Sequence, residues 1–272
     1  MQYESAYLAH HGILGMKWGV RRYQNPDGTR TEAGKKRYAS EDFAKESSHS
    51  IRTNSDGSKT VPSGFVFNRV GKETLDVNGS GALYVSHGKD DAARYIKSLG
   101  PTPLGKLLGT ASTTVQHIEA KGDLRMPSDA VMAKETAHLL LKNKTLLEEF
   151  NESIYSMAIG QGDISKDYIE KALRNPSSKD AVKLAYSFNS LLGDPSYADV
   201  SRIYYNHFRK AGYDILPDLH DTLSGTSKTA AIVINPSKLK VTSSTFITKD
   251  IMKAAKQYIK TLEKLKVSEL IK

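Results

Sequence analysis

From residue 64 onwards, apolar and polar residues recur with two different periods, which predict strands and helices in one folded body. Stretches rich in aromatic and β-branched residues, or alternating apolar with polar, predict strands at residues 64–70, 82–86, 113–119, 213–216, 229–235 and 241–247. Apolar residues every three to four positions predict helices at 89–99, 128–142, 144–158, 165–173, 177–192 and 197–210. Strands thus precede and follow a helical insert at about 128–211, a pattern typical of an α+β fold and not of alternating βαβ units.

Capping residues support several of these helices. Ser128 is a good N-cap for the first helix of the insert, and Gly212 is a good left-handed stop after the last. In the expected helix at 144–158, four apolar residues share one face: Leu146, Leu147, Phe150 and Ile154. Thr248 caps a C-terminal amphipathic helix at 248–272, whose apolar stripe faces away from its lysines and consists of Ile251, Ala254, Ala255, Tyr258, Leu262 and Leu265.

The first forty residues do not show either period. They contain the only tryptophan, Trp18, and an apolar run of Ile13, Leu14 and Met16, yet nothing in them is typical of a helix or strand of a packed domain. We therefore expect residues 1–40 to be an extended N-terminal arm that docks on a partner. Residues 41–62 are polar, with five serines, the turn-forming run Asn54–Ser58 and Pro62, so we expect a linker there.

Charge is concentrated in this arm. The chain has a net charge of +9. Residues 16–37 contribute +5 of it, because they contain seven basic residues, Arg21 and Arg22 among them, and two acidic ones. Basic residues beside Trp18, Tyr23 and Tyr38 would suit nucleic acid, through phosphate contacts and base stacking. The apolar run would gain nothing from nucleic acid, so the composition favours docking by apolar anchors with a solvated basic end.

Several classes of chemistry have no support in the sequence. The chain has no cysteine, which excludes disulfides and thiolate catalysis. Its histidines lack metal-ligand spacing, and it has no phosphate-binding glycine loop and no serine nucleophile elbow. It also has no apolar run of the roughly 20 residues that a membrane helix needs, and no signal peptide at its start. We therefore expect no metal, no membrane partner and no signal-directed export.

One group of residues in the folded body is coherent as a site. Arg69 belongs to the first expected strand, and its guanidinium is suited to a diphosphate. Tyr84 and Ser86, two apart on the second strand, share a face, and Tyr95 lies on the following helix. The two tyrosines are suited to stacking on a flat heteroaromatic ring. Residues 212–221 add three carboxylates and a histidine near a strand end: Asp214, Asp218, Asp221 and His220.

Residues 11–28, continuing through 33–38, resemble a module of tailed-phage and prophage proteins that are encoded among head genes of Gram-positive hosts. The resemblance implies a phage protein of the virion or of the bacterial host cytoplasm. It implies phage head or portal proteins as partners of the arm, and packaged DNA as a further partner. The residues expected to dock are Ile13, Leu14, Met16, Trp18, Arg21 and Arg22.

Residues 64–69, 81–86, 212–214 and 231–239 are similar to the strands of ADP-ribosyltransferase-like domains. The resemblance implies a split β-sheet core over 63–247 and NAD as substrate. Arg69 would bind NAD with Tyr95, and Tyr84 or Ser86 would orient the nicotinamide ribose. The family places a glutamate before the late strand, where it stabilises an oxocarbenium ion. Residues 228–231 contain no acid, so either Asp218 or Asp221 substitutes, or the domain is inactive.

Three hypotheses follow. The first is a virion-associated enzyme that transfers ADP-ribose from NAD to a host protein. The second is a non-enzymatic phage head or head-neck structural protein that uses an inactive form of the same fold. The third is an intracellular factor that binds a nucleotide and counters host defence.

Overall fold

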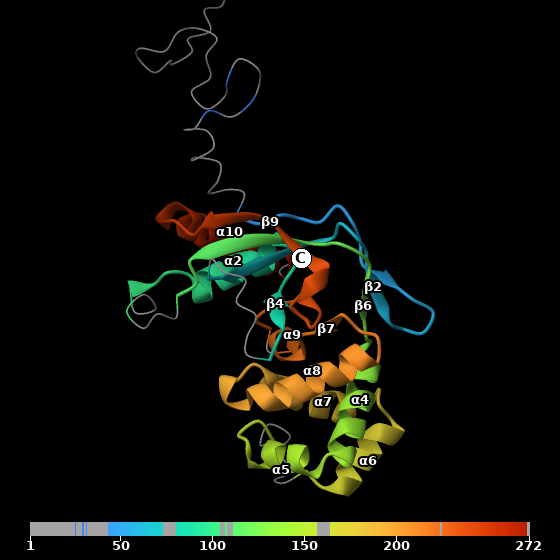
Figure 1. Cartoon of the computed structure of the whole chain (residues 1–272). Coiled ribbons are helices and arrows are strands. Elements are labelled where there is room, and N and C mark those ends of the chain that lie inside the picture. Colours follow the sequence, from blue (N-terminus) through green and yellow to red (C-terminus); the bar gives the residue numbers. More distant parts are fainter. Residues whose placement is uncertain are drawn as a thin grey trace, which may run out of the picture. The chain divides into compact units, whose positions relative to one another are not determined.

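The structure, a computed structural model, divides the chain into two compact units, Met1–Asp42 and Phe43–Lys272 (Figure 1). It describes residues 25, 29, 31, 43–72, 80–103, 107, 111–156, 164–223 and 225–270, except for the side chains of residues 223 and 265–270. The expected docking residues Ile13, Leu14, Met16, Trp18, Arg21 and Arg22 lie outside the described residues. The fold below is that of the second unit.

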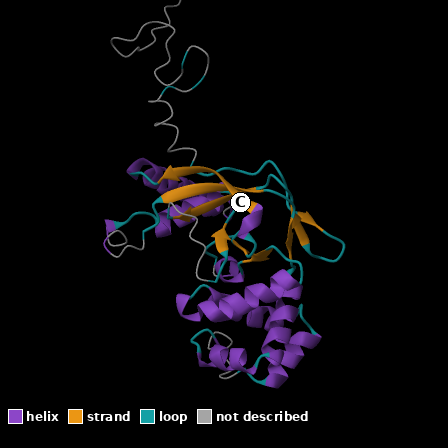
Figure 2. Ribbon diagram, viewed as in Figure 1, coloured by secondary structure: helices purple, strands orange, loops and turns teal. Residues whose placement is uncertain are grey.

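Nine strands form three antiparallel sheets in the described part of the chain (Figure 2). The first has the order β1 (Arg52–Thr53), β2 (Lys59–Val61), β6 (Leu124–Met126). The second has the order β3 (Val66–Gly71), β5 (Thr114–Ala120), β9 (Leu239–Phe246). The third has the order β4 (Leu83–Val85), β8 (Ala231–Val233), β7 (Ile215–Pro217).

The second and third sheets meet at a single antiparallel bridge between Asn68 and Ser86. Each residue donates its backbone N–H to the other's carbonyl, over 2.7 and 2.9 Å. Asn68 is further fixed by its side-chain amide, which exchanges hydrogen bonds with the backbone of Lys45. The second and third sheets are therefore separate three-stranded sheets whose strands are joined at one bridge.

The third sheet is buried on both faces. Leu83, Val85 and Val233 contribute to a core shared with the second sheet. Tyr84 and Ile232, which alternate with them along the strands, pack against the helices. A strand that is buried on both sides carries an uninterrupted apolar sequence, which explains the run of apolar residues at 230–234.

Two helices, α2 (Lys89–Leu99) and α10 (Lys249–Leu270), pack against each other beside β3. Their apolar faces enclose a third core with Ile96, Val115 and Ile251. As expected, Thr248 begins α10, since its side chain accepts a hydrogen bond from the N–H of Ile251. Phe43 also belongs to this core, where its ring meets that of Tyr258 edge-on.

The helical insert contains α4 (Asp129–Lys142), α5 (Lys144–Glu152), α6 (Lys166–Arg174), α7 (Lys179–Leu192) and α8 (Ala198–Lys210), and α9 (Leu219–Leu223) follows β7. In Figure 2 these helices gather on one side of the strands. Ser128 caps α4 by accepting from the N–H of Val131, and Gly212 ends the insert with a φ of 82°. The core of the insert is aromatic, with Phe150, Phe188, Tyr204, Tyr205 and Phe208. Short 3₁₀ turns lie at Pro195–Tyr197 and Pro236–Lys238.

These elements confirm the α+β class and correct two details of the sequence analysis. Residues from 43 onwards are not a linker, because they form β1 and β2 and bury Phe43 and Val61. Their polar composition hid two short strands, because both residues of β1 are exposed and β2 buries only Val61. The helix expected at 144–158 ends at Glu152, and Ile154 is 71% exposed instead of sharing the apolar face of Phe150.

Candidate functional site

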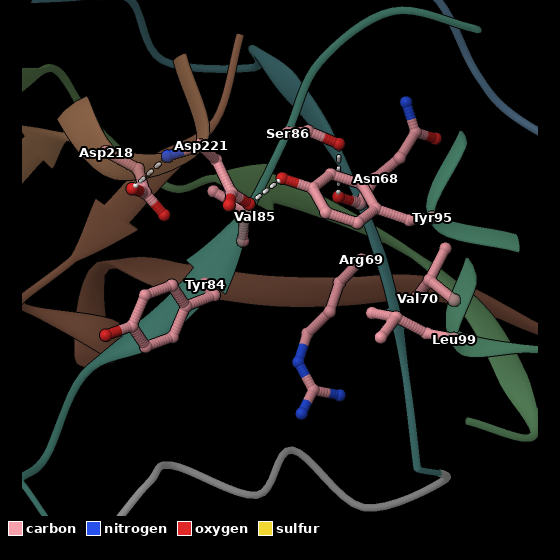
Figure 3. Close-up of a pocket in the computed structure, with 10 residues that line it drawn as sticks. All are labelled: Asn68, Arg69, Val70, Tyr84, Val85, Ser86, Tyr95, Leu99, Asp218 and Asp221. Carbon is pink, nitrogen blue, oxygen red and sulfur yellow. Dashed lines mark hydrogen bonds between the residues drawn. The ribbon is translucent and has the colours of Figure 1, made fainter. Parts of the chain in front are cut away.

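A cavity of about 200 Å³ opens where β3 and β4 separate (Figure 3). The two antiparallel strands are joined only at Asn68 and Ser86. Beyond this bridge, Arg69 and Val70 of β3 face Tyr84 and Val85 of β4 across the gap. Helix α2 and the start of α9 complete the wall with Tyr95, Leu99, Asp218 and Asp221.

Arg69 reaches the cavity from β3 with its side chain bent along the strand. Its Nη1 donates to Oε1 of Gln116 on β5 at 2.7 Å, so the guanidinium has a fixed partner. The guanidinium also covers Gly71, where an added Cβ would lie 2.5 Å from Nη1. Residues i and i+2 of a strand share a face, so only glycine at position 71 leaves room for this arrangement.

Tyr84 presents its ring to the cavity and turns its hydroxyl away (Figure 3). The hydroxyl lies 3.3 Å from the carbonyl oxygen of Leu192, to which it donates, and 3.2 Å from the hydroxyl of Tyr205. Burial raises the pKa of Tyr84 to about 12, with a further contribution from the charges of Asp218 and Asp221. The hydroxyl is therefore a structural group, and the ring is what Tyr84 offers a ligand.

Tyr95 stands on the opposite wall and is tied to α9. Its hydroxyl donates a hydrogen bond to Oδ2 of Asp221 (Figure 3). Burial raises the pKa of the Tyr95 phenol well above its usual value, and the bond to Asp221 adds to this effect. Tyr95 therefore stays protonated at neutral pH. Its hydrogen bond then holds one carboxylate oxygen of Asp221 in place at the wall of the cavity.

Asp218 is the most buried acid of the site, with 5% of its surface exposed. Its Oδ1 accepts from the N–H of Asp221 at 3.1 Å, which caps the short helix α9. Burial, together with the neighbouring charge of Asp221, raises the pKa of Asp218 to about 6. The group is thus a carboxylate at neutral pH that takes up a proton in mild acid.

Ser86 is buried and forms part of the bridge with Asn68, to whose carbonyl oxygen its hydroxyl is directed at 3.5 Å. Ser86 nevertheless lines the cavity. All six residues expected to bind or act on a nucleotide therefore line one hollow: Arg69, Tyr84, Ser86, Tyr95, Asp218 and Asp221. They come from four elements and span more than 150 residues of sequence.

Two residues of the acidic segment do not take part in the cavity. Asp214 is structural, since its carboxylate pairs with Lys238 at 2.8 Å and accepts from the N–H of Arg125. His220 stacks on Tyr186, and its Nδ1 lies 2.7 Å from Oγ of Ser190. Proximity in sequence to Asp218 and Asp221 was therefore no guide to their position.

Residues 228–231, where the resemblance expects a glutamate, line a different cavity of about 360 Å³. That cavity also contains His87 and Phe67, neighbours of the bridge residues whose side chains alternate to the other side. Thr229 is occupied structurally, because its hydroxyl and N–H both bond to Asp91. The carboxylates of the first cavity come instead from α9 and the residue before it.

Sequence reasoning missed the residues that support this site. Gln116 and Gly71 hold the side chain of Arg69, and Asn68 holds the bridge. An arginine two positions before a glycine on a strand was an available signal. The roles of Gln116 and Asn68 depend on strand register, which the sequence does not show.

Two further properties limit the chemistry. Among the residues that the structure describes, no three histidine, aspartate or glutamate side chains gather as a metal site would require. None of the described helices is both long and apolar enough to cross a bilayer.

Comparison with known proteins bears on the arm alone. Residues 2–25 match a family of unknown function (DUF7211), which is fewer than a tenth of the 272 residues. No curated protein matches the chain, and no solved structure does. The matched segment lies within the stretch that the sequence analysis assigned to docking, and the folded unit has no match.

Proposed function

We propose that the unit from residue 43 onwards is an ADP-ribosyltransferase-like domain that binds the nicotinamide end of NAD in the cavity between β3 and β4. The observation that carries this proposal is the convergence of Arg69, Tyr84, Ser86, Tyr95, Asp218 and Asp221 on one hollow. Only the pairs Tyr84 with Ser86 and Asp218 with Asp221 are close in sequence, so local spacing alone does not bring the six together.

The walls of the cavity suit a flat, amide-bearing ring. Tyr84 and Tyr95 contribute aromatic faces, and Val70, Val85 and Leu99 contribute apolar surface. Successive residues of a strand direct their backbone N–H and C=O groups to opposite sides. Two positions from the bridge, the backbone groups of Val70 and Tyr84 therefore point into the gap. A carboxamide has one donor side and one acceptor side, as a strand edge does, which favours nicotinamide over a ring without an amide.

The size of the cavity limits what it encloses. At about 200 Å³ it falls below the roughly 300–1,000 Å³ typical of sites that enclose a whole ligand. A nicotinamide ring and part of its ribose are therefore the portion inside. The diphosphate would extend past Arg69, whose guanidinium is partly exposed and geometrically suited to phosphate oxygens.

The carboxylates supply the electrostatics of the reaction. When the bond between nicotinamide and C1′ of the ribose breaks, nicotinamide leaves with the bonding electrons and positive charge develops on the sugar. Asp218 and Asp221 place negative charge on the wall of a largely apolar cavity, where it stabilises that charge most effectively. A nucleophile of a host protein then bonds to C1′ and loses its proton, which Asp218 can accept because its pKa is about 6.

A second function is favoured by one specific observation. The residues at the position of the family's glutamate are Lys228, Thr229 and Ala230, and they line the other cavity. An inactive form would bind NAD or another nucleotide without cleaving it. The protein would then serve as a phage head or head-neck structural component, or as a nucleotide-binding factor in the host.

The test separates these functions with the full chain. We expect NAD to raise the melting temperature and nicotinamide to be released on incubation. We expect Arg69→Ala and Tyr95→Ala to weaken NAD binding by about tenfold each, as loss of an ion pair or a stacked ring does. Tyr197→Ala, which removes a tyrosine outside the cavity, is the matched control. Binding without release supports the inactive form, and neither binding nor release refutes both nucleotide functions.

We also propose that the N-terminal arm attaches the protein to phage head or portal proteins. The support is its apolar and basic composition and the match of residues 2–25 to a separate family. Mass spectrometry of purified particles should detect the chain, and deletion of residues 1–40 should remove it from them. Absence of the full chain from particles would contradict this location.

A further inference from the structure

A groove runs along the first three turns of α10, away from the cavity described above. Its volume is about 910 Å³. The floor consists of Pro101, Pro103, Ile247 and Met252, and four lysines form its rim: Lys249, Lys253, Lys256 and Lys260. We call it the lysine groove.

The four lysines form one continuous charged edge. Their spacing of four, three and four residues places them on one face of α10, over roughly 16 Å at 1.5 Å per residue. All four are exposed, and none has an ion-pair partner among the described residues. Elsewhere in the same unit, lysines on helices do form such pairs, as Lys144 does with Glu148 and Lys166 with Glu170.

The floor is what separates this groove from an ordinary solvated helix face. Met252 is half-buried and lies directly over Gly100, where an added Cβ would be 2.5 Å from its sulfur. The two prolines add apolar surface to the floor and have no backbone N–H to donate. Phe246, which precedes the floor residue Ile247 in the chain, is 60% exposed. The surface is therefore apolar at its centre and positive along its edge.

We propose that the lysine groove docks an acidic, amphipathic segment of a partner protein, with apolar side chains on the floor and carboxylates against the lysines. Charge complementarity excludes two closer candidates. Residues 16–37 of this chain carry +5, and a second copy docked groove to groove would bring the same four lysines, so both would be repelled. A nucleic-acid backbone would satisfy the lysines and leave the floor unused.

The experiment uses the full chain and a labelled synthetic peptide of about 14 residues, long enough for the groove as a helix, with leucine on one face and glutamate on the others. One variant replaces the four groove lysines by glutamate. The control makes the same change at Lys134, Lys142, Lys171 and Lys179, which are exposed on helices of the insert. Each set lowers the net charge from +9 to +1, so they differ only in where the charge changes.

We expect saturable binding that the groove variant weakens by at least about tenfold and the control by no more than about twofold. In methyl NMR spectra, the peptide should shift the signal of Met252 and leave that of the buried Met132 in place. Equal weakening by both variants, or no binding, would overturn the proposal. So would a peptide of glutamate alone binding equally well, or a DNA duplex that binds more tightly and loses that binding in the groove variant.

Discussion

The carboxyl group of Asp218 is both a helix cap and a buried ionisable group. Its unfolded pKa is near 3.8 and its folded pKa is about 6. Between these values the folded state holds the extra proton, so stability falls as pH rises through this window. Above pH 6 the folded state carries the full cost of burying the ionised carboxylate. For a shift of about two pKa units this cost is on the order of 3 kcal/mol.

Asp218→Asn should therefore stabilise the protein at pH 8 and impair it as an enzyme. Asparagine caps a helix as well as aspartate and carries no charge to bury. We expect the free energy of unfolding to rise by about 1–3 kcal/mol at pH 8 and to change little at pH 4, measured by urea titration. Nicotinamide release should fall, and in the wild type it should decline below pH 6. If the substitution stabilised the protein less at pH 8 than at pH 4, this assignment would be contradicted.

His117 should give stability the opposite dependence on pH. It is buried, its Nδ1 lies 2.7 Å from Oγ of Ser243, and its Nε2 has no hydrogen-bond partner among the described residues. Burial, together with the charge of Lys45, lowers its pKa to about 4. The unfolded state therefore takes up the proton first, so stability is complete above pH 6.5 and falls as pH drops towards 4.

His117→Asn keeps a polar atom near the position of Nδ1 and does not titrate. We expect the loss of stability between pH 6.5 and 4 to be smaller in this variant than in wild type, measured by urea titration at each pH. His138→Asn, at a half-buried histidine of α4, serves as control. An unchanged pH profile in the His117 variant would show that the histidine is protonated in the folded state.

Tyr84 tests whether the site uses a ring or a hydroxyl. The resemblance gives Tyr84 or Ser86 the role of orienting the ribose, whereas the structure bonds the Tyr84 hydroxyl to Leu192 and Tyr205. Tyr84→Phe should therefore keep NAD affinity within about twofold and cost about 1–3 kcal/mol of stability, because Tyr205 loses its partner. Tyr84→Ala should lose affinity by about tenfold or more, since the stacking face is gone. Calorimetry with NAD measures the affinity of each variant. Equal losses of affinity in both would mean that the hydroxyl contacts the ligand.

At the scale of elements, α2 is joined to the loop before β8 through one side chain. Asp91 is 2% exposed and accepts hydrogen bonds from the hydroxyl of Ser227 and from the backbone N–H groups of Lys228 and Thr229. Asp91→Ala removes the acceptor of the buried Ser227 hydroxyl and of two partly buried N–H groups, so we expect a loss of about 3–5 kcal/mol in the free energy of unfolding. Asp250→Ala, in the first turn of α10 but exposed, should lose no more than about 1 kcal/mol. Similar losses in the two variants would contradict this role for Asp91.

The sequence predicted best what depends on local chemistry. The helix at 89–99, the cap at Ser128 and the stop at Gly212 follow from periodicity and capping, which act within a few residues. It failed where the outcome depends on distant partners. β1 is only two residues long and is held by pairing with β2, and the role of Asp91 depends on a loop 136 residues later.

The candidate site shows the same division. Residue types suggested that Arg69, Tyr84 and Tyr95 act together, but their meeting depends on a bridge between Asn68 and Ser86 that composition cannot reveal. The orientation of the Tyr84 hydroxyl is set by Tyr205, which is 121 residues away. Such contacts are fixed by packing and not by local preference, so they remained outside the sequence analysis.

At the scale of the molecule, the third sheet connects the two larger cores. Leu83 and Val85 face the core between the sheets, while Tyr84 faces the helical insert. The cavity lies at the edge of this sheet, and its walls come from the second sheet, the third sheet, α2 and the start of α9. The insert reaches it only indirectly, through the hydrogen bonds of the Tyr84 hydroxyl to Leu192 and Tyr205.

The boundary of the folded unit gives the last prediction. A chain shortened to residues 43–272 should unfold at the same urea concentration as the full chain, because it keeps the complete second unit. A chain shortened to residues 60–272 loses β1 and Phe43, which is 2% exposed, packs on Tyr258 and lies 5.2 Å from the ammonium of Lys89. We expect it to be less stable by about 4 kcal/mol or more, the usual cost of removing a buried phenylalanine. Phe43→Ala in the full chain should reproduce most of this loss and Phe246→Ala, at an exposed ring, very little. Equal stability of the two shortened chains would mean that residues 43–59 are the linker their composition suggested.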